Sequence, residues 1–286
     1  MNEIKQSLLS SKEDKKKEGI KDLLEVMANG VDVAALFECV VRCAASGQLE
    51  TRKLCYLYFA QMIAHEDPGM VRKALPRMQA DCNDGNPLIR AMAIKTMSLV
   101  SSPELVDTIV ETLKNLLNDS DAYVLKTAIL CVAKLHATNP KAIEKWGLVE
   151  VVRGFLSTSG VPLVLSNAVV ALHDMSRRQA ESYFRIDAQN VTKLLTGLDE
   201  FSEWGMVYVM DGFSRYAPRD TEETQKIIEG VSPRLQSSNS AVVLAAVKVL
   251  IKYLKYVTEP DTTSIIQKLG PPLVSLLSKE PEIQYV

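Results

Sequence analysis

The side chains that most often hold metals or carry out catalysis are sparse in this sequence. His65, His136 and His173 stand far apart, and none has a possible metal ligand three or four residues away. Cys39 and Cys43 are four residues apart, but they form no CxxC pair and no second pair follows them. Glycine-rich phosphate loops, GxSxG elbows and HExxH motifs are absent. The sequence therefore predicts no metal site, no catalytic residues and no cofactor.

The overall composition narrows the class of protein further. The chain has 286 residues, of which 47% are hydrophobic, so it can bury a large core. Its formal net charge is -2, which gives no basic field for nucleic acid. An odd number of cysteines, five, in apolar surroundings indicates reduced thiols in the cytosol. No signal peptide and no run of 18 apolar residues is present, so we expect a cytoplasmic protein that does not span a membrane.

One pattern of residues recurs along the chain. Short polar stretches such as Asn83–Asn86 precede apolar helical runs, and the third residue of each run serves as a marker. The markers fall at Thr51, Ile89, Val124, Val164, approximately Val207, Val243 and Ile283. A repeat of about 40 residues is typical of HEAT and armadillo proteins.

Each repeat is predicted to be a pair of helices. Within 87–100, Ile89, Ala93 and Met97 recur at helical spacing, and Pro87 suits the first turn of a helix. A second helical run follows in each repeat, as in 104–117. Because one helical hairpin cannot bury both of its faces, neighbouring hairpins must stack. The helix N-caps are expected at Asp119, Ser159 and Ser238.

The predicted fold is therefore an all-α solenoid of two-helix HEAT/armadillo-like repeats, forming one right-handed superhelix over residues 1–286. A lysine-rich capping helix is expected at about residues 1–30. The final segment KEPEIQYV resembles the start of a further repeat, which indicates a truncated solenoid. No segment alternates as a strand would, so no sheet is expected.

Two side-chain types stand out within this scaffold. Arg90 lies near a helix start, where the helix dipole disfavours a cation, so a carboxylate of a neighbouring repeat or a backbone carbonyl is its expected partner. Trp146 and Trp204 are expected to pack between adjacent helices, with an interface position as the alternative for Trp204.

A lysine-rich stretch, KEDKKKEGIK, permits two interpretations. In the first it is a solvated helix start whose acidic residues soften the positive charge. In the second it contacts anionic lipid at a membrane surface. The candidate lipid-binding residues are Lys12, Lys15, Lys16, Lys17 and Lys21, together with Arg52 and Lys53.

Several sequence segments together resemble those of one known family. They are CNDGNPLIRAMAIKTM, YVLKTAILCVAKLH, VSPRLQSSNSAVVLAAVKVLIKYL and LGPPLVSLLSKEPEIQYV. From about Lys5 to Val286 the sequence is similar to the trunk of the beta-adaptins, the large beta subunits of clathrin-associated adaptor complexes.

The resemblance implies a non-enzymatic scaffold subunit of a heterotetramer that acts in vesicle coat assembly, cargo sorting and intracellular protein transport. The implied partners are the medium, small and second large adaptin subunits. The complex would lie peripherally on Golgi, endosomal or plasma membranes. Clathrin would bind only through regions of the family that lie beyond Val286.

Two residue-level expectations follow from the resemblance. In some members the early lysine-rich helix contacts phosphoinositides, and Lys12, Lys15, Lys16 and Lys17 occupy the matching positions. Some members bind an Arf-family GTPase on an early helix, which corresponds here to 70–78. Leu75 occupies an apolar contact position there, and Arg72 stands where an apolar residue is expected.

Two alternatives stay open. A coatomer-like protein or another armadillo-type transport protein or scaffold would share the repeat pattern. An enzyme with an unrecognised site would require a pocket that joins His136 or His173 with a carboxylate.

Overall fold

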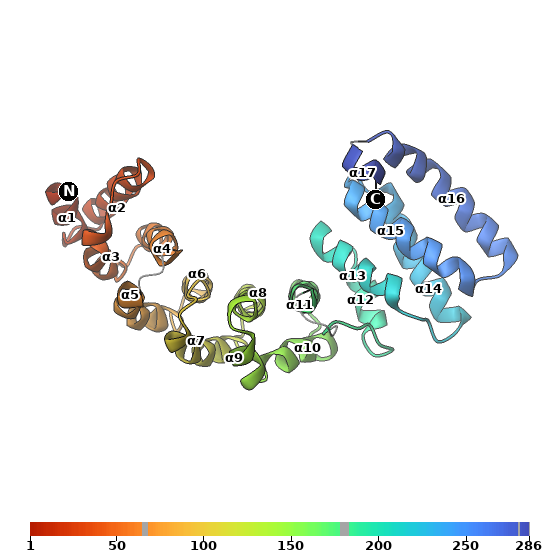
Figure 1. Cartoon of the computed structure of the whole chain (residues 1–286), viewed down its shortest axis with the longest axis horizontal. Coiled ribbons are helices and arrows are strands. Elements are labelled where there is room, and N and C mark those ends of the chain that lie inside the picture. Colours follow the sequence, from red (N-terminus) through yellow and green to blue (C-terminus); the bar gives the residue numbers. More distant parts are fainter. Residues whose placement is uncertain (65–67, 178–182, 280, 286) are drawn as a thin grey trace. The chain divides into compact units, whose positions relative to one another are not determined.

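Every regular element that the computed structural model describes is a helix (Figure 1). The structure describes residues 1–64, 68–177, 183–279 and 281–285, and these contain no strand. His65 lies outside the described residues. The chain groups into two compact units, Met1–Val149 (unit 1) and Glu150–Val286 (unit 2).

Unit 1 consists of two layers of helices. Layer A contains α2 (Glu13–Ala28), α4 (Leu49–Ala64), α6 (Pro87–Met97) and α8 (Ala122–Thr138). Layer B contains α3 (Phe37–Cys43), α5 (Pro68–Asp81), α7 (Pro103–Leu116) and α9 (Pro140–Lys145), with the short η1 (Ala34–Leu36) before α3. Consecutive helices of layer A pack side by side, and α4, α6 and α8 each also pack against a layer B helix.

Unit 2 repeats the arrangement. Its layer A consists of α11 (Pro162–Ser176), α13 (Glu203–Arg215) and α15 (Ser240–Tyr253). Its other helices are α10 (Leu148–Thr158), α12 (Val191–Gly197), α14 (Thr221–Val231) and α16 (Glu259–Leu277), with η2 (Ser232–Gln236), η3 (Leu254–Tyr256) and α17 (Pro281–Tyr285). The predicted all-α solenoid of two-helix repeats is confirmed, and the handedness of the superhelix stays a prediction.

The N-terminal segment differs from the prediction of one capping helix. It folds as two helices, α1 (Asn2–Leu8) and α2, which pack against each other. Ser10 accepts the backbone N–H of Lys12 between them. A side chain at Gly19 would meet Ser7, so this glycine lets α1 approach α2 closely.

Five of the seven marker residues lie in the core, whereas Val207 and Ile283 are only partly buried. Ile89, Val124 and Val164 are buried, and each is the third residue of its layer A helix. Val243 is also buried, but the third residue of α15 is Val242. The assigned register is therefore one residue late in α15, where two consecutive buried valines make both choices fit the apolar pattern.

A turn held by a polar side chain precedes each of the layer A helices α4, α6, α8, α11 and α15. The side chains of Asp84 and Asp119 accept the backbone N–H two residues later, at 2.8 and 2.9 Å. The serines Ser46, Ser159 and Ser237 accept in the same way, at 3.1, 3.2 and 3.2 Å.

The N-caps follow these turns. Asp121 and Asn239 are the capping residues of α8 and α15, so the predicted caps Asp119 and Ser238 are wrong. The predicted cap Ser159 is wrong as well, because α11 starts after Val161. Short polar side chains serve turns and caps equally well, which makes the two positions hard to separate by residue type.

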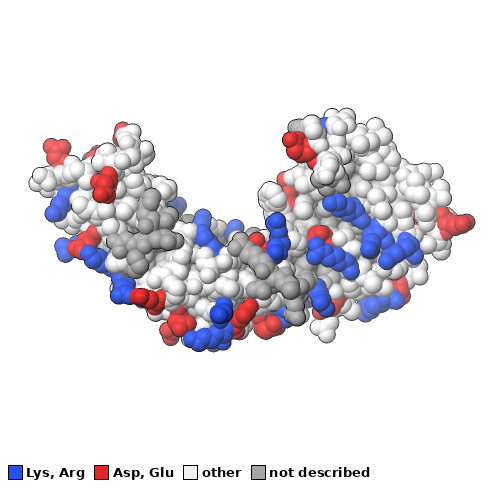
Figure 2. Space-filling model, in the orientation of Figure 1, with Lys and Arg blue, Asp and Glu red and all other residues white. Residues whose placement is uncertain are grey.

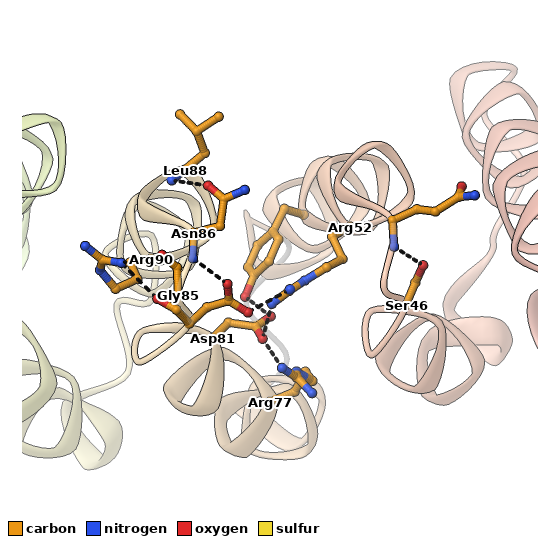
Figure 3. A network of polar contacts seen from close by, with 11 residues as sticks. Ser46, Arg52, Arg77, Asp81, Gly85, Asn86, Leu88 and Arg90 are labelled. Atoms are coloured by element: carbon orange, nitrogen blue, oxygen red, sulfur yellow. Dashed lines mark hydrogen bonds and ion pairs between the residues drawn. The ribbon is translucent and has the colours of Figure 1, made fainter. Parts of the chain in front are cut away.

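The turns also receive charged side chains from the preceding repeat. Arg90 donates to both carboxylate oxygens of Asp119, at 2.7 and 2.8 Å, and to the carbonyl of Asp84 at 2.9 Å. The prediction for Arg90 is confirmed. One repeat earlier, Arg52 donates to Asp84 at 2.8 Å and to the buried Asp81 at 2.6 Å (Figure 3). These two arginines are each the fourth residue of their helix, α4 or α6, so the junctions are equivalent.

Replacing a marker should destabilise the fold, whereas replacing its neighbour should not. We expect Ile89→Ala to lower the free energy of unfolding by about 2–4 kcal/mol, because it leaves a cavity between α6 and its neighbours. Leu88→Ala changes the adjacent, exposed residue and should stay within about 0.5 kcal/mol. Urea denaturation of both variants measures the difference. Equal midpoints would show that the assigned register is wrong.

Acid should remove the contribution of the Arg90 junction. The hydrogen bond from Arg90 holds the pKa of the Asp119 carboxyl below its ordinary value of 3.8. Such a carboxyl stabilises the fold above its unfolded pKa, and this contribution is lost as the pH falls through the folded pKa. The difference in melting temperature between the natural chain and Asp119→Asn should be largest above the unfolded pKa of about 3.9 and should shrink as the pH falls through the lower folded pKa. A difference that does not change with pH in circular dichroism melts would contradict the assignment.

Candidate interaction surfaces

The described residues contain no group of three or more histidine, cysteine or carboxylate side chains that could hold a metal ion. All five cysteines are buried. His136 is buried as well, on α8. His173 lies 3.0 Å from a carboxylate oxygen of Asp211, and its ring packs at a tilt against Tyr208, so it joins α11 to α13. This pair lowers the pKa of Asp211, chiefly through the hydrogen bond from His173.

Three of the predicted lipid-binding lysines lie around one carboxylate. Lys17 pairs with Glu50, and Lys21 and Lys53 also act electrostatically on that carboxyl. Together these charges lower the pKa of Glu50, the hydrogen bond from Lys17 contributing most. Lys21 and Lys53 are exposed. The structure thus gathers a small basic surface, formed by Lys17, Lys21 and Lys53, on α2 and α4.

Two other predicted lipid-binding residues, Lys16 and Arg52, are mostly buried and form ion pairs within the fold. Lys16 is mostly buried and bonds Glu13 at 2.8 Å, and Glu13 in turn accepts from Ser46 of the next repeat. The side chain of Arg52 is only 11% exposed and is held by Asp81 and Asp84. Both cations are used to stack hairpins in this structure, and Arg52 is not presented to a lipid.

Lys12 and Lys15 are exposed at the start of α2. Lys15 lies two residues from Lys17, and residues two apart on a helix do not share a face. The six predicted lysines therefore do not form one patch. On the face shown in Figure 2, much of the surface is uncharged, and basic and acidic side chains lie near one another along its lower rim.

The predicted GTPase contact lies on α5. Arg72 is exposed and pairs with Glu104 of α7, whereas Leu75 is 7% exposed and packs in the core of unit 1. Two charged side chains are therefore exposed on this helix, Arg72 and the adjacent Lys73, which pairs with Glu38. The GTPase contact stays a prediction.

Sequence reasoning missed a row of exposed apolar residues. The second residue of four layer A helices is large, apolar and exposed: Leu88 and Tyr123 in unit 1, and Leu163 and Trp204 in unit 2. Trp204 is 71% exposed, so the expected core packing is wrong for this residue. Trp146 does join adjacent helices, because its indole donates to Asp107 of α7 at 3.0 Å. The signal is the second position of each layer A helix, where an apolar side chain adds nothing to the core.

A second exposed apolar surface lies on α16 in unit 2. Ile266, Val274 and Leu277 are more than half exposed and follow helical spacing along one face. In a solenoid, this kind of face is covered by a neighbouring hairpin. No helix among the described residues is long and apolar enough to cross a membrane.

Comparison with known proteins agrees with this architecture. The family model described as the adaptin N terminal region matches residues 1–286. The chain belongs to the adaptin family. Its relatives are beta subunits, as the sequence resemblance predicts. The AP-1 complex subunit beta of Dictyostelium discoideum is 42% identical over 287 residues, and AP-1 complex subunit beta-1 of Homo sapiens is also 42% identical.

This adaptin chain spans about 30% of the length of those two curated relatives, while 99–100% of the chain is matched. A more distant relative, AP-1 complex subunit beta-1 of Saccharomyces cerevisiae, is 36% identical and is matched over 39% of its length. Among solved structures, a homology model of the full-length AP-3 complex has a TM-score of 0.66 at 17% identity. It covers 99% of this chain and 50% of its own, and at that identity it shows the shared fold.

Proposed function

We propose that this beta-adaptin chain is a non-catalytic scaffold subunit of a heterotetrameric adaptor complex, acting in vesicle coat assembly, cargo sorting and intracellular protein transport. The observation that carries the proposal is the family match over the whole chain, together with relatives that are named as subunits of AP-1 complexes. A solenoid of stacked hairpins supports this role, since it offers long faces for other proteins. The proposed partners are the medium, small and second large adaptin subunits.

The subunit composition tests this proposal. We expect affinity purification of the full-length protein from its own cells to recover a medium, a small and a second large adaptin chain in equal amounts, measured by mass spectrometry. Recovery of coatomer subunits would instead favour the coatomer-like alternative. Recovery of transport-receptor cargo without adaptins would contradict the proposal.

We further propose that the complex lies peripherally on the cytoplasmic face of Golgi, endosomal or plasma membranes, and that α2 contributes to the contact with anionic phosphoinositide lipid. The basic surface of Lys17, Lys21 and Lys53 supports this, with Lys12 and Lys15 nearby in sequence. A lysine near an anionic membrane contributes about 1 kcal/mol, and Glu50 offsets part of that. The isolated chain should therefore bind the membrane weakly. Membrane affinity should be appreciable only in the assembled complex, where contacts of other subunits contribute as well.

Charge reversal tests the lipid contact. The triple change of Lys17, Lys21 and Lys53 to Glu should weaken pelleting of the intact complex with phosphoinositide-containing liposomes by about tenfold at low salt. A matched triple change of the exposed Lys141, Lys248 and Lys252 to Glu, placed elsewhere, should have little effect. Equal pelleting of the two variants, with both complexes intact, would support the interpretation of a solvated helix start.

We also propose that an Arf-family GTPase binds the exposed side of α5. The accessible side chains there are Arg72 and Lys73, each paired with a carboxylate of a neighbouring helix. Because Leu75 is buried, a GTPase would meet these ion pairs before it reached the leucine. Such a contact would be polar and sensitive to salt.

A further inference from the structure

The exposed face of α6 and α8 in unit 1 combines large apolar side chains with lysines. Neither helix contains an acidic residue, although both carry lysine. The large apolar side chains Leu88, Tyr123 and Leu130 on this face are 38%, 44% and 36% exposed. Lys95 and Lys134 are exposed beside them. The face thus alternates leucine or tyrosine with lysine.

These side chains belong to one surface. Helices α6 and α8 pack side by side, and the Cys131 thiol of α8 lies 3.7 Å from the Ile94 carbonyl of α6. Lys95 of α6 and Lys134 of α8 both act electrostatically on that thiol, so they flank the same seam between the helices. Leu88 and Lys95 are seven residues apart, as are Tyr123 and Leu130, which places each pair on one face about 10 Å apart.

The positive charge of this surface is not neutralised locally. Lys126 lies with its ammonium 4.9 Å above the Tyr123 ring. No ion pair of Lys95, Lys126 or Lys134 is seen in the described parts of the chain. The nearby carboxylates are engaged elsewhere: Asp119 binds Arg90, and Asp121 accepts the N–H groups of the first turn of α8.

The neighbouring pairs of layer A helices differ. The exposed positions of α2 and α4 include Asp14, Glu25 and Glu50 among their lysines. In unit 2, α11 and α13 carry the apolar Leu163 and Trp204, but α11 contains no lysine or arginine. Uncompensated lysines and exposed apolar side chains therefore occur together on the α6–α8 face and not on these others.

We infer that the α6–α8 face is a docking surface for an acidic amphipathic helix of a partner polypeptide. Exposed apolar side chains with a seven-residue spacing match the apolar stripe of a helix laid along the seam. Carboxylates beside that stripe complement Lys95, Lys126 and Lys134. The apolar side chains stand singly between lysines, which suits a narrow helix better than the flat headgroup layer of a membrane.

A designed peptide tests the inference on the purified chain. The probe is a fluorescein-labelled helix of about 20 residues, long enough to span about 30 Å, with leucine on one stripe and glutamate beside it. We expect fluorescence anisotropy to show saturable binding. The double variant Lys95→Glu/Lys134→Glu should weaken the dissociation constant by about tenfold or more, and Leu88→Ser/Leu130→Ser by about threefold or more.

The controls separate this surface from general charge attraction. The matched variant Lys5→Glu/Lys141→Glu changes the same charge at two exposed sites elsewhere and should bind the peptide as the natural chain does. A peptide of the same composition in scrambled order should bind at least about tenfold more weakly. The inference fails if the scrambled peptide binds equally, if the two double-glutamate variants behave alike, or if the natural chain does not bind. It also fails if Lys95→Glu/Lys134→Glu abolishes pelleting with phosphatidylserine vesicles but leaves peptide binding unchanged.

Discussion

The stacking of consecutive hairpins in unit 1 depends on a cation that reaches from one layer A helix into the polar turn before the next. Arg90 meets Asp119 in this way, and Arg52 meets Asp84. The same aspartates also hold the backbone of their own turns, so one carboxylate fixes both the turn and the spacing between repeats. Because each arginine is mostly buried, a mismatch of register would leave a charge without a partner, which is costly. The apolar markers set how tightly the hairpins pack. The arginines set how far each hairpin is shifted along the neighbouring hairpin.

Features that depend on neighbouring residues could be predicted from the sequence, whereas contacts between distant residues could not. The repeat length, the helical hairpins and the need of Arg90 for a partner all follow from periodicity and from the helix dipole. The placement of Arg52 does not, because its partners lie 29 and 32 residues away. Lys17 likewise meets Glu50 across 33 residues. A local run of lysines therefore looks like one basic patch, while the fold distributes its members between the surface and the interior.

The exposed residues follow a different rule from the buried ones. The second residue of each layer A helix is exposed and can vary without disturbing the core, and in four helices it is large and apolar. Trp204 was assigned to the core by its residue type, since a lone tryptophan usually packs between helices. Its place as the second residue of α13 directs it outward instead. Position within the repeat thus predicts exposure better than hydrophobicity does in this fold.

The junctions also determine how the chain responds to pulling or heating. Each polar turn is anchored by the helix immediately before it, so cohesion passes from neighbour to neighbour rather than through a shared centre. Weakening one junction leaves the hairpins on both sides folded and lets them move apart from each other. Because Arg52 and Arg90 are mostly buried, salt screens these ion pairs much less than it screens pairs at the surface. The resistance of such a chain to stretching is therefore set separately at each junction, by the side chain that fills the turn there.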